Sequence, residues 1–207
     1  MEPVGVELYP SGDSAPELTG EGVRVFQAAL ADYRRYFFAR PVTFAFRGLH
    51  YGRYGSESED GRISPLFLGR SSLVRGYESD TFSASECNPL PGQDDCPVFQ
   101  RLIGSKIAML STEVRVPLLG TREYGLINAP GLPVELVGFF EGGVAWTEDE
   151  DPQLEWATDS QERIPVFSAG AALRILLAYI PIELYYAKPF QRPDQGWTFG
   201  FAIKPGW

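Results

Sequence analysis

Apolar and polar residues alternate along most of this chain with a period of two, which is typical of β-strands that have one apolar and one polar face. In residues 106–118, Leu110 and Val114 fall on one face, whereas Glu113 and Arg115 fall on the other. Convincing helical periodicity is almost absent, so the pattern predicts an all-β protein. The same alternation recurs in residues 134–146, 166–177 and 197–207.

Clusters of Gly, Pro and acidic residues divide the chain into eight predicted antiparallel strands. An average strand of a soluble sheet has about 5 or 6 residues, whereas a tilted strand that crosses a bilayer needs about 9 to 11. Most of the predicted strands have the greater length, so we expect an antiparallel transmembrane β-barrel. The predicted strands are residues 3–9, 22–38, 42–55, 105–118, 133–147, 165–177, 179–188 and 196–205.

The connections between these strands alternate between short and long, as in outer-membrane barrels with short periplasmic turns and long outer loops. Residues 39–41 and the join near Ala178 are short, whereas residues 56–104 and 147–165 are long and polar. Residues 120–133 do not fit, because they form a long connection where a short periplasmic turn is expected.

Loop length and the even strand count together predict an orientation in the membrane. The acidic residues 148–162 are expected at the cell surface, and Trp207 is expected on the periplasmic side. Aromatic residues near the strand ends suit the two girdles of an outer-membrane barrel, although core aromatics of a soluble barrel would give the same pattern. These aromatic residues are Tyr36, Phe37, Phe38, Trp146, Tyr185, Tyr186, Trp197 and Trp207.

The composition limits the size of the fold and the classes of partner. A chain of 207 residues suits a single domain, so we expect residues 1–207 to form one barrel domain. The net charge of -9 and the pI near 4.7 provide no basic surface for nucleic acid. The first residues lack the features of a signal peptide. These features predict either a soluble, cytoplasmic protein or a piece of a longer secreted chain.

Two cysteines, Cys87 and Cys96, lie in a short segment that is rich in proline, glycine and acidic residues. We expect them to form a disulfide outside the membrane, in an oxidising compartment, and two free thiols are the alternative. The single histidine, His50, has no spacing typical of a metal ligand and no serine or cysteine nucleophile near it. We therefore expect no enzymatic activity, no metal and no cofactor.

From about residue 42 to the end, the chain resembles the C-terminal barrel half of the BamA/TamA superfamily, also called the bacterial surface antigen family. Members of this superfamily assemble or translocate proteins at the bacterial outer membrane. Five segments and a final aromatic strand carry the resemblance in their order and spacing. The segments are LFLGRSSLVRGY (66–77), STEVRVPL (111–118), VGFFEGGVAW (137–146), FSAGAALRI (167–175) and PIELYYAKPF (181–190), and the final strand ends in Trp207.

The resemblance implies that residues 56–104 form a long extracellular loop that folds back into the barrel. The arginine at the loop tip, Arg75, would pair inside the barrel with Glu113 and Glu141. Both glutamates lie on the charged faces of their predicted strands, and a guanidinium between two carboxylates makes strong charge-assisted hydrogen bonds. Arg75 is therefore expected to act as a latch that holds the loop inside the barrel.

Two neighbouring residues complete the expected loop tip. Gly76 would let the backbone turn tightly beside the barrel wall, and Tyr77 would pack beneath it. The chain departs from the family pattern at Arg70, where a second glycine is frequent, and at Glu141, where aspartate is common.

The last predicted strand resembles the signal by which outer-membrane barrels are recognised for assembly. It combines an apolar face with a strand edge that can pair with another sheet. The residues that form this expected signal are Trp197, Phe199, Phe201, Ile203 and Trp207.

The function that these features predict is protein insertion or translocation at the bacterial outer membrane. Full barrels of the family have sixteen strands, so the chain would correspond to half a barrel that closes alone, stays open or oligomerises. The expected partners are outer-membrane lipid, client proteins, and a missing barrel half or periplasmic domain. Two alternatives remain open: a passive outer-membrane anchor for a missing domain, and a soluble β-barrel that binds an apolar ligand.

Overall fold

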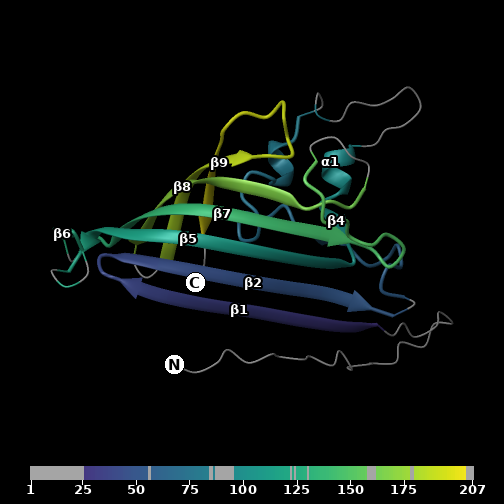
Figure 1. Cartoon of the computed structure of the whole chain (residues 1–207), viewed down its shortest axis with the longest axis horizontal. Helices are drawn as coiled ribbons and strands as arrows, with labels where there is room; N and C mark the ends of the chain where they lie inside the picture. Colours follow the sequence, from purple (N-terminus) through teal and green to yellow (C-terminus); the bar gives the residue numbers. More distant parts are fainter. Residues whose placement is uncertain are drawn as a thin grey trace.

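The protein is built around one large β-sheet (Figure 1). The computed structural model describes residues 26–203, with gaps at 56, 84–85, 87–95, 122, 124, 130, 158–161 and 178–179. Seven long strands form antiparallel neighbours in the order β1-β2-β5-β7-β8-β9-β10. They are β1 (Gln27–Ala39), β2 (Val42–Tyr54), β5 (Lys106–Gly120), β7 (Val134–Trp146), β8 (Val166–Leu177), β9 (Ile180–Pro189) and β10 (Thr198–Ile203).

This sheet confirms the predicted all-β class and its antiparallel pairing. Each long strand lies within a few residues of a predicted one, since the alternation of apolar and polar residues marks the strands and the turn residues mark their ends. The first predicted strand, residues 3–9, lies outside the described residues, as do the first residues of the second predicted strand.

The connection between β5 and β7, where a turn is expected, contains a further short strand. This strand, β6 (Ile127–Asn128), pairs in parallel with the end of β5. Proline has no backbone N–H, and the register of β5 on β7 shifts between Pro117 and Leu119. The carbonyl of Pro117 accepts a hydrogen bond from the backbone N–H of Leu126 at 3.0 Å. The connection therefore returns along β5 and satisfies backbone groups there.

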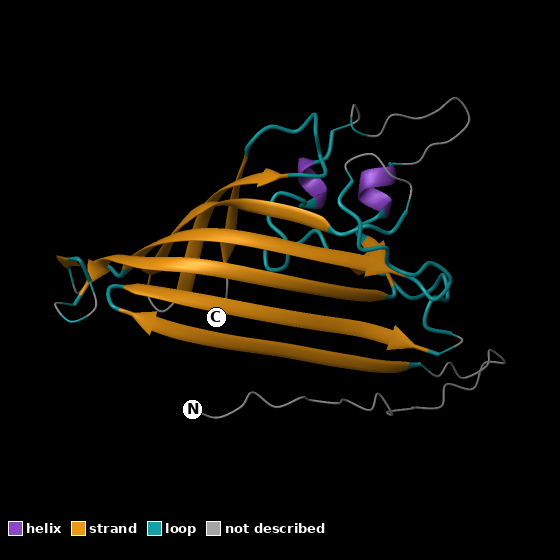
Figure 2. Ribbon diagram, viewed as in Figure 1, coloured by secondary structure: helices purple, strands orange, loops and turns teal. Residues whose placement is uncertain are grey.

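The long segment between β2 and β5 contains regular structure as well. A two-stranded sheet forms from β3 (Leu66–Phe67) and β4 (Ile103–Gly104). Two single helical turns lie between them, a 3-10 turn at Ser79–Thr81 and α1 at Pro97–Gln100. Figure 2 shows these elements gathered at one end of the large sheet.

The large sheet is strongly curved and has two edge strands, β1 and β10 (Figures 1 and 2). Within the described residues, these two strands do not pair with each other, so the sheet is not closed into a barrel there. Among the described residues, no helix has both the length and the apolarity needed to cross a bilayer.

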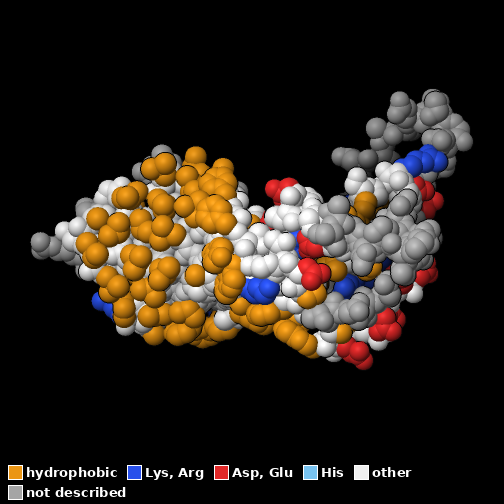
Figure 3. Space-filling model, turned by 90° about the horizontal axis from the view of Figure 1, so that it is seen from above, with side chains coloured by type: hydrophobic (Ala, Val, Ile, Leu, Met, Phe, Trp, Pro, Cys, Tyr) orange, Lys and Arg blue, Asp and Glu red, His pale blue; other side chains and the backbone are white. Residues whose placement is uncertain are grey.

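The two faces of the sheet differ in chemistry. We call the face that carries Glu113 and Glu141 the inner face, and both side chains are buried there. The opposite, outer face exposes large apolar side chains, and Figure 3 shows such side chains gathered over one half of the molecule. The most exposed ones on the strands include Tyr33, Phe37, Phe46, Leu110, Phe140, Tyr186, Phe199 and Phe201.

The expectation that all of the aromatic residues near the strand ends lie in girdles on the outer surface is wrong for some of them. Phe37 and Tyr186 are exposed on the outer face, whereas Tyr36 lies beside Arg115 and Tyr185 is buried. Adjacent residues of a strand point to opposite faces, so two neighbouring aromatic residues cannot both face outward.

A compact apolar core lies between the inner face and the segment that connects β2 to β5. Leu68, Leu73 and Val74 of this segment pack against Ile107 and Met109 of β5. All five side chains are buried. The segment therefore lies on the inner face and is held there by apolar contacts.

Two glycines of this segment give a matched test of how tightly it packs. A Cβ atom at Gly69 would lie 2.1 Å from the carbonyl oxygen of Tyr77, whereas a Cβ atom at Gly61 would meet nothing within 4 Å. We expect Gly69→Ala to lower the free energy of unfolding by about 1 to 3 kcal/mol, as overpacking typically does, and Gly61→Ala to change it little. Denaturant unfolding of both variants measures the difference. Equal effects would show that the segment does not pack as described.

Candidate functional site

The candidate site is built around the loop tip, residues 70–77. The carbonyl of Arg70 accepts hydrogen bonds from the backbone N–H groups of Leu73 (2.8 Å) and Val74 (3.0 Å), which close a turn. The side chains of Leu73 and Val74 then enter the apolar core. This anchoring brings the next residue, Arg75, against the inner face, where its side chain is fully buried.

The Arg75 guanidinium lies among three buried carboxylates. Its Nη2 donates a hydrogen bond to Glu113 at 2.6 Å. Its Nη1 lies 3.4 Å from Glu141, and its Nε lies 3.0 Å from Glu183. These two contacts are ion pairs without hydrogen-bond alignment. The backbone N–H of Arg75 also donates to the Glu141 carboxylate at 3.0 Å. Glu141 therefore binds both the side chain and the main chain of the loop tip.

An aromatic ring packs against the Arg75 guanidinium. The central carbon of the Arg75 guanidinium lies 4.0 Å from the centre of the Phe139 ring, a cation–π contact. Phe139 is paired across the sheet with Gly170, where a Cβ atom would come within 2.8 Å of the ring. Because Gly170 has no side chain, the ring can lie over the neighbouring strand and form a platform for Arg75.

Two further arginines join the carboxylates. Arg115 donates to Glu113 at 2.9 Å, and Arg174 lies 3.2 Å from Glu113 and 2.6 Å from Glu183. All of these side chains have little or no exposure to solvent. The three carboxylates Glu113, Glu141 and Glu183 thus face the three guanidinium groups of Arg75, Arg115 and Arg174. The formal charges within this set cancel, as burial of charge requires.

Gly76 and Tyr77 fix the backbone beside Arg75. Gly76 has a φ angle of 87°, a left-handed conformation that glycine adopts without strain. The hydroxyl of buried Tyr77 lies 3.0 Å from the carbonyl oxygen of Phe167 and accepts a hydrogen bond from the backbone N–H of Gln191 at 3.1 Å. Tyr77 therefore connects the loop tip to β8 and to the connection after β9.

The surroundings stabilise the charged form of Arg75 and the neutral form of Tyr77. Burial alone lowers the pKa of Arg75, but the charges of Glu141, Glu183 and Glu113 outweigh burial and raise it. Burial also raises the pKa of the Tyr77 hydroxyl. Pairing with the three carboxylates therefore favours the cationic form of Arg75.

Those of the remaining expected site residues that the structure describes lie apart from this network. Cys96 is disulfide-bonded, and Cys87 lies outside the described residues. Trp197, Phe199, Phe201 and Ile203 are all exposed on the outer face, and Trp197 stacks on Tyr186 with a ring separation of 5.1 Å. Trp207, the end of the expected assembly signal, also lies outside the described residues.

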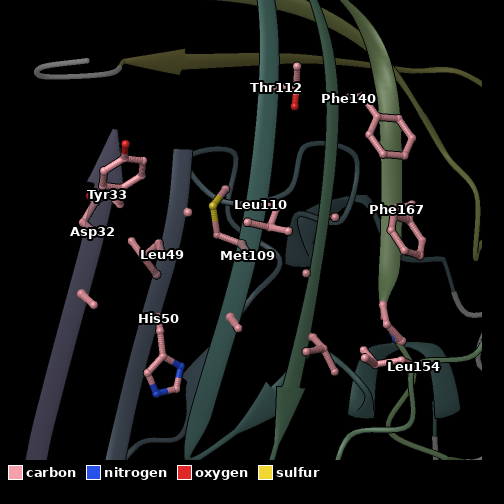
Figure 4. Close-up of a pocket in the computed structure, with 17 residues that line it drawn as sticks. Asp32, Tyr33, Leu49, His50, Met109, Leu110, Thr112, Phe140, Leu154 and Phe167 are labelled. Atoms are coloured by element: carbon pink, nitrogen blue, oxygen red, sulfur yellow. The ribbon is translucent and has the colours of Figure 1, made fainter. Parts of the chain in front are cut away.

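A shallow apolar groove of about 730 Å³ lies along the outer face (Figure 4). Tyr33, Gly48, Leu110, Gly142 and Phe167 are successive cross-strand partners from β1 to β8, so bulky and small residues alternate across it. The bulky side chains lie over the neighbouring glycines, since a Cβ atom at Gly142 would come within 2.6 Å of the Phe167 ring and one at Gly48 within 3.3 Å of Leu110. Within the described residues, no three His, Cys, Asp or Glu side chains are grouped as a metal site would require.

Several residues of the network were not expected from the sequence. Glu183, Arg174 and Phe139 contact Arg75 or its partner carboxylates. One signal for Glu183 was present, because only two residues separate β8 from β9 and Arg174 then pairs directly with Glu183.

The sequence matches a known protein family over most of its length. The Omp85 superfamily domain matches residues 35–206, which is well over half of the chain. No curated protein matches the chain. The match confirms the resemblance found in the sequence and covers every strand from β2 to β10, together with the Arg75 network. The chain therefore belongs to the Omp85 superfamily, a family of non-enzymatic transport and assembly proteins of the outer membrane.

Proposed function

We propose that this chain forms a β-barrel domain in the bacterial outer membrane and takes part in inserting or translocating other proteins there. The observation that carries the proposal is the Arg75 network on the inner face of a sheet whose outer face is apolar. A soluble barrel with an apolar ligand site would have the opposite polarity, with apolar side chains inside.

In this proposal the outer face contacts membrane lipid, and the inner face borders the lumen. Arg75 holds the segment between β2 and β5 inside the lumen, and that segment enters from the extracellular side. A missing barrel half would pair with the edges of β1 and β10 that carry no partner strand among the described residues. The sheet is open within the described residues, which supports the idea that further strands complete the barrel.

Reconstitution tests this function against the passive anchor. We expect the protein to leave the membrane only with detergent, and protease added to intact cells to cleave within residues 148–162. Liposomes that contain the protein should speed the folding of an added outer-membrane barrel protein relative to empty liposomes. Membrane residence without faster folding would support a passive anchor instead. A monomer that is soluble without detergent would contradict both membrane functions.

A further inference from the structure

A second buried arginine lies outside the strands, on the connection between β9 and β10. Arg192 is only 1% exposed, although arginine on a surface connection is usually solvated. Burial of a guanidinium costs free energy unless carboxylates or other acceptors lie close enough to compensate for it. The partners of Arg192 therefore show what this position does.

All five N–H groups of Arg192 have an acceptor on the segment that follows Arg75. Nη1 donates to the carbonyl of Gly76 (2.7 Å) and to the hydroxyl of Thr81 (2.8 Å). Nη2 donates to the carbonyl of Thr81 (2.8 Å) and to Glu86 (2.8 Å), and Nε donates to the second oxygen of Glu86 (2.7 Å). The contact with Glu86 is bidentate, the arrangement that the planar guanidinium forms best.

Further contacts make the site specific for arginine. The guanidinium carbon lies 3.9 Å from the centre of the Phe82 ring, so the plane of charge stacks on an aromatic face. Lysine offers one compact ammonium group and cannot reproduce the five directed donors. Gln191, the preceding residue, contacts the Tyr77 hydroxyl. The β9–β10 connection therefore contacts the segment at Tyr77 and again at Glu86.

The pKa of Glu86 favours a lasting ion pair between Glu86 and Arg192. Burial alone raises the pKa of Glu86, but the hydrogen bonds and charge of Arg192, with help from Ser83, lower it more. Glu86 is thus ionised at neutral pH, so the bidentate contact keeps its full charge. The pair joins parts of the chain that are 106 residues apart in sequence.

We propose that Arg192 is a second positioning residue for the loop, which fastens residues 76–86 to the C-terminal hairpin formed by β9 and β10. Arg75 anchors the loop tip to the wall formed by β5, β7 and β9, and Arg192 holds the next stretch from the hairpin connection. The hairpin ends in the edge strand β10, so a displacement of the hairpin must break the five hydrogen bonds or move the segment with it. The loop and the edge of the sheet are thereby coupled. This inference deepens the proposed function and rests on it for its purpose, but its geometry can be tested without any translocation assay.

Hydrogen exchange of the purified whole protein in detergent tests the coupling. Arg192→Gln and the milder Arg192→Lys should raise the exchange of residues 76–86 at least about tenfold, while exchange in β5 stays unchanged. The matched control is Lys188→Met, because the Lys188 ammonium donates to the carbonyl of Gln195 within the same connection and does not touch the loop. This control should leave residues 76–86 as protected as in the parent protein.

The loop-side variant Glu86→Gln tests reciprocity, because coupling between two sites acts in both directions. It should raise exchange at Gln191 and Gln195, whose backbone N–H groups bond to Tyr77 and to Arg192. The proposal is overturned if the Arg192 variants change the exchange of residues 76–86 by less than about twofold, or if Lys188→Met changes it equally. If Arg192→Gln fails to fold, Arg192→Lys and Glu86→Gln still decide the question. Hydrogen exchange reports only how firmly the segment is held. The test therefore stays valid even if the protein does not speed the folding of another barrel protein in liposomes.

Discussion

Replacement of Arg75 by glutamate is expected to release the loop tip and to destabilise the protein strongly. Arg75→Glu removes the cation that contacts Glu113, Glu141 and Glu183 and adds a fourth carboxylate beside them. Loss of one partner from a buried ion pair lowers stability by about 3 to 5 kcal/mol. Denaturant unfolding in detergent measures the change in the free energy of unfolding, and protease sensitivity of residues 66–77 measures release of the loop.

An exposed arginine in the same segment provides the control. The side chain of Arg70 is exposed, so Arg70→Glu reverses the same charge five residues earlier and should alter stability by less than about 1 kcal/mol. Adding Glu141→Arg to the Arg75→Glu variant should restore part of the lost stability. The recovery is partial because Glu141 also accepts the backbone N–H of Arg75, and arginine has no acceptor. Equal losses of stability for Arg75→Glu and Arg70→Glu would show that Arg75 does not serve as an internal latch.

The strands and their faces could be predicted because a period of two is a local property of the sequence. The alternation placed Glu113, Arg115 and Glu141 on polar faces, and all three side chains are buried on the inner face. It could not determine what covers that face. Arg75 was singled out by its motif and family resemblance, since the alternation ends at the strand and contains no information about loops.

Contacts between distant segments explain what the sequence did not predict. Glu183 reaches Arg75 because the curvature of the sheet brings β9 over the loop tip, and sheet curvature is a collective property of all strands. The Phe139 platform depends on the absence of a side chain on the neighbouring strand, at Gly170. Arg192 meets Glu86 only after both connections have folded at the same end of the sheet. Short-range patterns do not record such contacts.

The second large loss of stability is expected when Glu113 is replaced by glutamine, because this change upsets the charge balance of the buried network. Glu113 is fully buried and contacts three guanidinium groups, those of Arg75, Arg115 and Arg174. Arginine does not lose its proton in a protein, so Glu113→Gln leaves three cations beside the two carboxylates Glu141 and Glu183. The amide is close in shape to the carboxylate, but its NH2 group would face guanidinium donors that both Glu113 oxygens now accept. The expected loss of about 3 to 5 kcal/mol therefore comes from the lost charge and from a lost acceptor.

The same substitution at the rim of the network separates buried charge from solvated charge. Glu135 is 39% exposed and lies 3.8 Å from Arg174, so Glu135→Gln should lower the free energy of unfolding by no more than about 1 kcal/mol. Adding Arg115→Gln to the Glu113→Gln variant removes one excess cation and should make the double variant more stable than the single one. Denaturant unfolding of the four proteins, including the parent, measures both differences. Equal small losses for Glu113→Gln and Glu135→Gln would mean that water screens the inner face and that apolar packing, not charge, holds the loop in place.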